Sequence, residues 1–314
     1  MDAGIIIQIV LLLVGFVFLI KGSDFFVDGA SSIAAILKIP TIIVGLTIVA
    51  FGTSAPEAAV SITSSIVGNN AMAVSNVVGS NLFNMLMVIG IAALMSNLLM
   101  EKSVLNKDLP FLVGITVLWA IFLVIGWDIS AIEGIILLAL LVIYVVYLIK
   151  DAKKSSDANY VEKPKLTTPK SIIFILVGLA GIIIGGDLVV DSASAIAIAL
   201  GMSETLVGLT IVAIGTSLPE LVTSITALRK GENQLVIGNV VGSNIFNILF
   251  VLGASSAISR IPLDSSMLID VLFMVAVTVL CFIFGKTQEK YDKKEGIILI
   301  ILFIAYMAFA ILRN

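Results

Sequence analysis

The sequence predicts an all-α membrane protein with ten transmembrane helices, arranged as two inverted five-helix repeats. Of the 314 residues, 60% are hydrophobic and only 12% are charged, whereas soluble domains carry about 25% charged residues. Two stretches of 40 residues are close copies of one another. A single hydrophilic segment, residues 151–170, separates five apolar runs from five others. Composition, repetition and this division together predict the fold class.

Each apolar run is long enough to cross a bilayer, which needs about 20 mostly apolar helical residues. The first run follows Met1 and Asp2 without a basic segment, so we expect a membrane span there rather than a cleaved signal peptide. The ten expected spans lie near residues 4–36, 41–67, 71–98, 109–126, 129–149, 171–200, 205–228, 234–259, 266–285 and 296–312.

The hydrophilic segment also defines the domain organisation. Residues 1–150 form the first repeat, residues 151–170 a linker, and residues 171–314 the second repeat. Because each repeat has an odd number of spans, the second repeat enters the membrane from the opposite side. Inverted repeats of this kind are typical of secondary transporters, which build their binding site where the two halves meet.

The basic residues predict the orientation in the membrane. With the linker in the cytoplasm, most Lys and Arg fall on the cytoplasmic side, as the positive-inside rule requires, and only Arg260 and Arg313 fall clearly outside. The sequence thus predicts a multi-pass cell-membrane protein with a cytoplasmic linker and two extracellular termini. The basic residues placed inside are Lys38, Lys102, Lys107, Lys150, Lys153, Lys154, Lys163, Lys165, Lys170, Arg229, Lys230, Lys286, Lys290, Lys293 and Lys294.

The repeated stretches are residues 45–84 and 208–247, which align at a constant offset of 163 with 24 of 40 positions identical. Each copy carries one glutamate, Glu57 or Glu220, inside an otherwise apolar stretch. A carboxylate at membrane depth is costly and usually faces a partner, an ion or a water-filled cavity. Two glutamates related by the repeat therefore predict one binding site built by both halves.

Each glutamate follows a Gly-Thr-Ser-X-Pro motif in the middle of a span. Pro56 and Pro219 cannot donate to the carbonyl group four residues back, so we expect the helices to kink or break and the carbonyls of Gly52 and Gly215 to lose their partners. Protein, water or an ion must satisfy such carbonyls in a membrane. Further oxygen ligands are the hydroxyl groups of Thr53, Ser54, Thr216 and Ser217.

This set of ligands is made of hard oxygen atoms, which suit Na⁺ and Ca²⁺ rather than transition metals. The chain has no histidine, and its single cysteine, Cys281, lies in an apolar run. A histidine-ligated metal site, a histidine proton relay, a disulfide and a cysteine metal cluster are therefore excluded.

A second motif, Asn-Val-Val-Gly-Ser-Asn-X-Phe-Asn, ends each copy of the repeat. The i, i+4 spacing of Ser80 with Asn84, and of Ser243 with Asn247, places each pair on one helix face. Their amide oxygens can coordinate a cation, and their amide N–H groups can donate to a glutamate. Serine, threonine and asparagine in membrane helices also serve helix packing, and that interpretation stays open for each of these side chains. The glycines before the serines, Gly79 and Gly242, are expected to let helices approach closely.

Four aspartates follow the same offset in the first and sixth spans. Asp24 and Asp28 correspond to Asp187 and Asp191. Their positions in these spans favour a role at a helix end or in gating, and a purely structural role is equally compatible with the sequence. Lys21 is a candidate partner of Asp24 or Asp28.

The doubled GTS-X-PE and NVVGSN-[LI]-FN motifs resemble those of the calcium/cation antiporter superfamily, and most closely its sodium/calcium exchanger family of prokaryotic type. The resemblance extends over the whole chain. It implies a secondary antiporter that exchanges Na⁺ for Ca²⁺ by alternating access, that needs no cofactor and that is not an enzyme. The implied partners are the two transported ions and the lipid bilayer, with no nucleic acid, and a monomer is compatible with the sequence.

The resemblance also implies the cation ligands. Glu57 and Glu220 would bind Ca²⁺ together with backbone oxygens of Thr53 and Thr216. One sodium set would comprise the Ala213 carbonyl, Thr216, Ser243 and Glu220, and the other the Ala50 carbonyl, Thr53, Ser80 and Glu57. Ser54 and Ser217 would lie beside these sets, and Asn84 and Asn247 would flank the centre. The first and sixth spans would slide across this core.

One departure from the family pattern is that Asn84 and Asn247 are both amides, whereas some relatives have an aspartate at one of these positions. The central charge is then −2, from the two glutamates alone. One Ca²⁺ neutralises this charge and three Na⁺ leave +1, so exchange at that ratio would be electrogenic. The missing carboxylate weakens the case for K⁺ co-transport and for a proton stored there.

Two alternatives remain for the sequence. One is a Ca²⁺/H⁺ antiporter in which the glutamates carry protons, and the other is a passive cation channel. An intramembrane hydrolase has little support because no histidine and no pairing of a nucleophile with a base is present.

Overall fold

The computed structural model describes residues 3–155, 164–202, 207–262 and 265–313, and these residues are almost entirely helical. The helices and π-helical segments of the first half are α1 (Ala3–Leu37), α2 (Thr41–Val44), η1 (Gly45–Val49), α3 (Ala50–Thr53), α4 (Ala55–Ile66), α5 (Asn70–Phe83), η2 (Asn84–Val88), α6 (Ile89–Met95), η3 (Val104–Asp108), α7 (Leu109–Gly126) and α8 (Ala131–Ser155). Those of the second half are α9 (Thr168–Ala199), η4 (Gly208–Val212), α11 (Ala213–Gly215), α12 (Leu218–Arg229), α13 (Asn233–Phe246), η5 (Asn247–Leu252), α14 (Gly253–Ile258), α15 (Ser265–Gln288) and α16 (Lys293–Arg313).

Eight helical stretches within the described ranges are long and apolar enough to cross a membrane, and one bent helix pair brings the number to nine. These nine match nine of the ten expected spans. The remaining expected span, 205–228, is occupied by η4, α11 and α12 with a break after Gly215, and its first two residues lie outside the described part of the chain. Helices α8 and α9 also extend into both ends of the expected linker.

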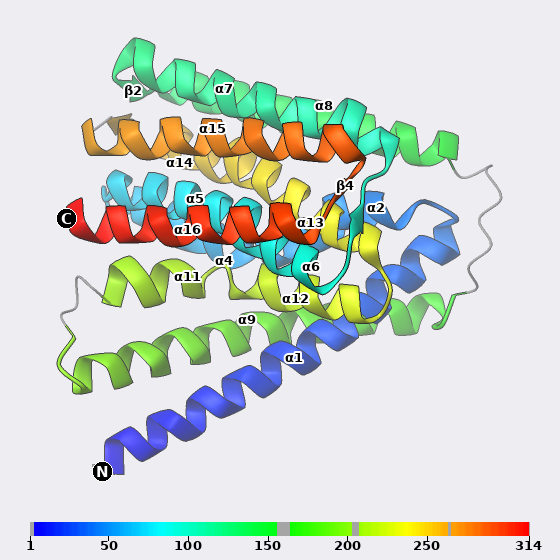
Figure 1. Ribbon diagram of the computed structural model, residues 1–314, viewed down its shortest axis with the longest axis horizontal. Coiled ribbons are helices and arrows are strands. Elements are labelled where there is room, and N and C mark those ends of the chain that lie inside the picture. The colour runs from blue at the N-terminus through cyan, green and yellow to red at the C-terminus, as the bar shows by residue number, and fades with distance from the viewer. Residues whose placement is uncertain (1–2, 156–163, 203–206, 263–264, 314) are drawn as a thin grey trace.

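The helices pack as a layered bundle (Figure 1). Helices α1 and α9 lie side by side along one flank, and α7, α8 and α15 lie along the opposite flank. Glycines permit the close approach of α1 to α9, since a Cβ atom at Gly22 would lie 2.7 Å from the backbone nitrogen of Ile182, and one at Gly185 would lie 2.6 Å from that of Leu19. Small residues at such contacts let membrane helices pack backbone to backbone.

Two short antiparallel ladders connect the halves. Strand β1 (Leu98–Leu99) pairs with β4 (Lys290–Tyr291), and β2 (Asp128–Ile129) pairs with β3 (Ile261–Pro262). Each ladder joins a strand of the first half to one of the second half.

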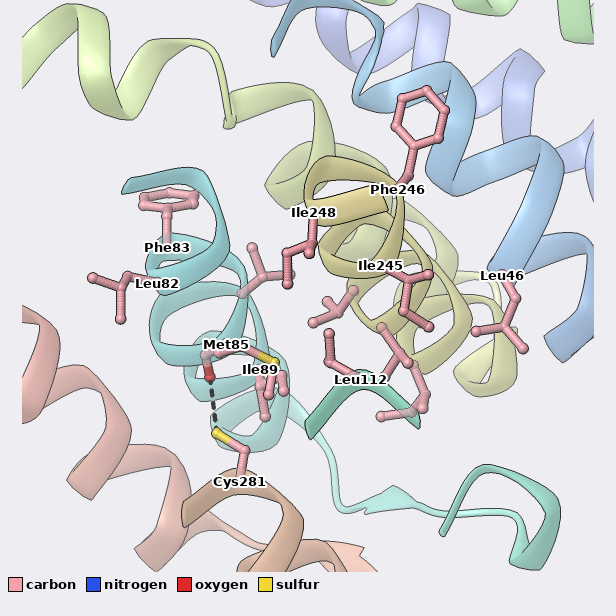
Figure 2. Packing of buried hydrophobic residues seen from close by; sticks show 14 of the residues in the cluster. Leu46, Leu82, Phe83, Met85, Ile89, Leu112, Ile245, Phe246, Ile248 and Cys281 are labelled. Carbon is pink, nitrogen blue, oxygen red and sulfur yellow. Dashed lines mark hydrogen bonds between the residues drawn. The ribbon is translucent and has the colours of Figure 1, made fainter. Parts of the chain in front are cut away.

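The core of the bundle consists of the helices that contain the second repeated motif. Figure 2 shows side chains of η2 and α6, such as Met85 and Ile89, beside side chains of α13 and η5, such as Ile245 and Ile248. All four side chains are buried. Cys281 from α15 is also buried and unbridged, and its Sγ lies 3.7 Å from the Met85 carbonyl. The repeated motifs therefore lie inside the protein and not at its lipid-facing surface.

The two repeated glycines differ in their surroundings. A Cβ atom at Gly242 would lie 2.7 Å from both the Leu46 carbonyl and the Ala50 Cβ, so close approach is confirmed there. A Cβ atom at Gly79 would meet no described atom within 4 Å, so the expectation of close approach is wrong for this glycine.

Candidate functional site

Both expected helix breaks are present, and both place a glutamate just after the break. Helix α3 ends at Thr53 and α4 begins at Ala55, with a bend of 49° between the two parts. In the second half, α11 ends at Gly215 and α12 begins at Leu218. Pro56 stands in the first turn of α4, where a missing N–H is tolerated. The Gly52 carbonyl accepts a backbone N–H in the capping turn, so the expectation that it loses its partner is wrong.

Glu57 lies in the first turn of α4 and is fully buried. Its Oε1 accepts hydrogen bonds from the hydroxyl groups of Ser80 and Ser217, each at 3.1 Å. The other oxygen, Oε2, is buried and has no hydrogen-bond partner among the described residues. Ser217 belongs to the helix break of the opposite half, so the second half helps to hold the carboxylate of the first.

Glu220 occupies the corresponding place in the first turn of α12 and is also fully buried. Its Oε1 accepts a hydrogen bond of 2.9 Å from the hydroxyl of Ser54. Its Oε2, like that of Glu57, is buried and has no partner within the described ranges. The contacts therefore cross between the halves in both directions.

The crossed contacts change how the expected ligands are grouped in space. The Ala50 carbonyl lies 3.4 Å from both the Thr53 and the Ser243 hydroxyl groups. The Ser243 hydroxyl thus lies beside the Ala50 carbonyl, although the expected grouping assigned Ser243 and Ala50 to different sodium sets. Ser217, expected only beside the sodium sets, contacts Glu57 directly. Ala213 begins α11, one turn before Thr216.

Asn84 and Asn247 begin the π-helical segments η2 and η5, and both are fully buried. Their Nδ2 groups donate to side chains of the opposite half, whereas both Oδ1 atoms lack a partner among the described residues. Short π-helical segments occur frequently at functional sites. Together with the two carboxylate oxygens, the site contains four buried oxygen acceptors, in two repeat-related pairs, that have no hydrogen-bond partner within the described ranges.

The structure adds two asparagines that the sequence interpretation missed. Asn239 Oδ1 accepts a hydrogen bond of 3.0 Å from the Thr53 hydroxyl, and Asn76 Oδ1 accepts one of 3.4 Å from that of Thr216. Asn76 Nδ2 also donates to the Glu57 carbonyl at 3.2 Å. Both asparagines are identical in the two copies of the motif, and this identity is the signal that could have identified them.

The four repeated aspartates lie outside this centre and fall into two different environments. Lys230 Nζ lies 2.9 Å from Asp28 and 3.6 Å from Asp24, and it also donates to the Asp24 carbonyl at 2.8 Å. Lys21 contacts Asp24 at 3.7 Å. Asp187 and Asp191 instead line a cavity of about 770 Å³. Both helix breaks reach this cavity, whose wall includes Pro56, Pro219 and Thr216.

The chemistry of the centre is that of a hard cation site. Within the described ranges neither Glu57 nor Glu220 has a basic partner, because the ion pairs join other residues. No cluster of three or more carboxylate or cysteine side chains that could hold a metal occurs in the same part of the chain. Two carboxylates, two amide oxygens, hydroxyls and backbone carbonyls are ligands typical of Na⁺ and Ca²⁺.

Apolar helices around a buried centre of oxygen atoms define a multi-pass membrane protein that transports cations. The family model described as "Sodium/calcium exchanger protein" matches residues 7–150 and 170–312. The chain therefore belongs to the sodium/calcium exchanger family and is a cation/Ca²⁺ exchange antiporter rather than an enzyme.

Individual relatives match over nearly their whole length. The chain is 38% identical to the candidate antiporter CaxA of Alkalimonas amylolytica, covering 96% of this chain and 98% of CaxA. It is 32% identical to the sodium/calcium exchanger MaX1 of Methanosarcina acetivorans, again over 96% and 98% of the two chains. A structure of the sodium-calcium exchanger NCX_Mj soaked with Na⁺ and Sr²⁺ matches with a TM-score of 0.87 and 30% identity, covering 97% of this chain and 98% of NCX_Mj.

Proposed function

We propose that this protein exchanges Na⁺ for Ca²⁺ across the cell membrane by alternating access. Its ten spans form two inverted five-helix repeats, residues 1–150 and 171–314, joined by a cytoplasmic linker at residues 151–170, with both termini extracellular. The basic residues on the linker side and the odd number of spans in each repeat support this topology. The exchanger named MaX1 and the Na⁺-soaked structure of NCX_Mj support Na⁺ as the coupling ion.

The observation that carries the proposal is the group of four buried oxygens that have no hydrogen-bond partner in the part of the chain that the structure describes, on Glu57, Glu220, Asn84 and Asn247. A buried acceptor without a hydrogen bond is destabilising by about 1–3 kcal/mol, and more when it is charged. A cation bound among these atoms removes that penalty for all four together. Ca²⁺ is the ion best matched, since its two charges balance the two carboxylates and it takes six to eight oxygen ligands.

The remaining oxygen atoms supply the other ligands. Backbone oxygens at Thr53 and Thr216 complete the Ca²⁺ site, and the sodium sites use the oxygens around the same two carboxylates. The proposed sodium ligands are the Ala50 and Ala213 carbonyls, Thr53, Thr216, Ser80, Ser243, Glu57 and Glu220, with Ser54 and Ser217 beside them.

Exchange follows because the two ions compete for the same carboxylates. A site filled by Ca²⁺ or by Na⁺ is neutral or nearly so, and it can pass from one access state to the other. A site that holds two uncompensated carboxylates resists that passage, because exposing such charges to low dielectric is costly. With three Na⁺ for one Ca²⁺, each cycle moves one net positive charge.

The test is ⁴⁵Ca²⁺ uptake into liposomes that contain the purified protein, with Na⁺ inside, clamped pH, and either Na⁺ or choline outside. We expect uptake only with an outward Na⁺ gradient. Uptake that is independent of Na⁺ but driven by a pH gradient would replace the proposal with Ca²⁺/H⁺ exchange. Uptake that needs no counter-ion and does not saturate would indicate a channel.

A further inference from the structure

The two central asparagines are held from outside the site by a second pair of asparagines. Asn84 Nδ2 donates to Asn244 Oδ1 at 3.3 Å, and Asn247 Nδ2 donates to Asn81 Oδ1 at 3.1 Å. Asn81 and Asn244 are themselves related by the repeat offset. Each bond joins the first half of the molecule to the second.

All four asparagine side chains are buried, with exposed fractions between 0 and 2%. An amide carries one acceptor oxygen and one donor NH₂ group on opposite sides of the same carbon. When its NH₂ group is bound on one side, its oxygen must face the other side. The Oδ1 atoms of Asn84 and Asn247 are the ones without partners, so the outer asparagines direct these oxygens away from themselves.

Proton counting supports the same orientation. Ser80 accepts a hydrogen bond of 3.2 Å from Asn247 Nδ2 and donates its own proton to Glu57 Oε1 at 3.1 Å. If the Asn247 amide were reversed, Ser80 would face its oxygen. The single hydroxyl proton of Ser80 could then be donated either to Glu57 Oε1 or to Asn247 Oδ1, but not to both. Asn81 acts here as an acceptor only, because its Nδ2 has no partner in the described part of the chain.

We propose that Asn81 and Asn244 are positioning residues for cation binding: each holds the central asparagine of the opposite half with its oxygen directed to the cation. This inference rests on the proposed function and goes beyond it, since neither residue is among the proposed ligands. Without them the central amides can turn their NH₂ groups toward the site, and a donor there repels a cation. Residues that orient metal ligands typically change metal affinity 10–100-fold when they are removed.

Substitutions of Asn244 and Asn81 should weaken Ca²⁺ binding to different extents. Asn247 Nδ2 has a second acceptor in Ser80, whereas Asn84 Nδ2 donates to Asn244 Oδ1. Asn244→Leu should therefore weaken Ca²⁺ binding by about 10-fold or more, and Asn81→Leu should weaken it less. The isosteric Asn244→Asp and Asn81→Asp variants keep an oxygen acceptor and should bind Ca²⁺ more tightly than the leucine variants.

The experiment measures Ca²⁺ binding to purified protein in detergent, from the rise of the unfolding temperature with Ca²⁺ concentration, and needs no transport. Ser255→Ala is the matched control, because Ser255 is also a buried polar residue, in α14, and its hydroxyl has no partner within the described ranges. A double-mutant cycle separates positioning from packing. If Asn244 acts through Asn84, Asn244→Leu has no further effect on Ca²⁺ affinity once Asn84 is replaced by Ala.

The possible results are distinct. Independent effects of the two substitutions in the cycle, or leucine variants that bind Ca²⁺ as Ser255→Ala does, would overturn the positioning role while ⁴⁵Ca²⁺ exchange by the unmodified protein still stands. Failure of the unmodified protein to exchange Na⁺ for Ca²⁺ would instead overturn the proposed function.

Discussion

Helix α1 is fixed to the second half of the molecule by ion pairs, whereas its repeat counterpart α9 borders a cavity. Lys230, at the end of α12, reaches Asp28 at 2.9 Å and Asp24 at 3.6 Å. The corresponding acids on α9 line the cavity of about 770 Å³, and the position that corresponds to Lys230 is Val67. The two halves share one centre, but among the described residues the ion pairs to the repeated aspartates occur on α1 alone.

The repeated glycines show the same difference. At Gly242, helix α13 lies against η1 and α3 with no room for a Cβ atom, and at Gly79 no described atom lies within 4 Å of one. Inverted repeats in transporters change access when the two halves exchange conformations. The halves therefore pack differently around their repeated glycines, and the proposed alternating access predicts that this difference is exchanged between the halves in the other access state.

The largest effect should come from replacing the two glutamates. Because both halves contribute one glutamate to the shared centre, we expect Glu57 and Glu220 to be equally essential, although the halves differ at α1 and α9. Glu57→Gln and Glu220→Gln each remove one of the two charges that balance Ca²⁺. We expect ⁴⁵Ca²⁺ exchange to fall to the level of protein-free liposomes in both variants. The fold should persist, since an amide of the same shape also avoids the desolvation of a buried charge.

Glu101→Gln is the control, because Glu101 lies outside the site and contacts Ser103. Size-exclusion profiles and unfolding temperatures show whether each variant folds. Exchange at the unmodified rate by either glutamate variant would contradict the assignment of the site.

The glycine pair gives the next largest effect. Gly242→Ala inserts a methyl group where backbone and side-chain atoms stand 2.7 Å away, and overpacking of this kind destabilises by about 1–3 kcal/mol. Gly79→Ala should leave the unfolding temperature unchanged but should slow exchange, because the other access state needs close packing at Gly79. Thermal unfolding and ⁴⁵Ca²⁺ uptake on the same preparations separate the two outcomes. Equal loss of stability in both variants would mean that the halves do not exchange conformations.

Most of the helices and the central residues could be predicted from the sequence, because both depend on local chemistry. Apolar length predicts spans, proline predicts the breaks before Glu57 and Glu220, and the duplicated motif marks the centre. The crossed hydrogen bonds could not be predicted, since Ser54 approaches Glu220 and Ser217 approaches Glu57 only after the halves have packed.

The asymmetry between the halves was hidden for another reason. Gly79 and Gly242 are the same residue in the same motif, so no local pattern distinguishes a packed glycine from an open one. The alignment of the two copies shows that Val67 stands where the second copy has Lys230. The consequence of this difference could not be predicted, because it depends on where Asp24 and Asp28 lie in space.

A smaller effect should follow from breaking the Lys230 ion pairs. Lys230→Met removes a partly buried contact to two carboxylates, and a pair of this kind contributes about 1 kcal/mol or less, or up to about fivefold in the ratio of two states. The reporters are Ser31→Cys on α1 and its repeat counterpart Ser194→Cys, which lies in the cavity wall. In detergent, a membrane-impermeant maleimide should label the cysteine at position 194 in the unmodified background. It should label the cysteine at position 31 faster after Lys230→Met.

The matched variant is Val67→Lys, which gives the first half a lysine at the position that corresponds to Lys230. It should slow labelling at position 194 by favouring the closed form of that flank, and buried Cys281 should stay unlabelled throughout. Labelling rates that do not respond to either substitution would show that the ion pairs do not control access.

The smallest effect should come from Asp187 and Asp191, which we expect to act on cations through the electrostatic field in the cavity and not through direct ligation. Replacing both with Asn lowers the negative potential in the cavity, whose wall includes Thr216. Because these acids are partly solvated, we expect the apparent affinity for Ca²⁺ to fall by only about two- to fivefold at low ionic strength. The loss should be smaller for Na⁺, which carries half the charge, and it should fade in high choline chloride as the Debye length shortens. Glu289→Gln, in the exposed turn before β4, serves as the control. A loss of affinity that persists at high ionic strength would instead make these aspartates direct ligands, and the open flank would then hold a cation site of its own.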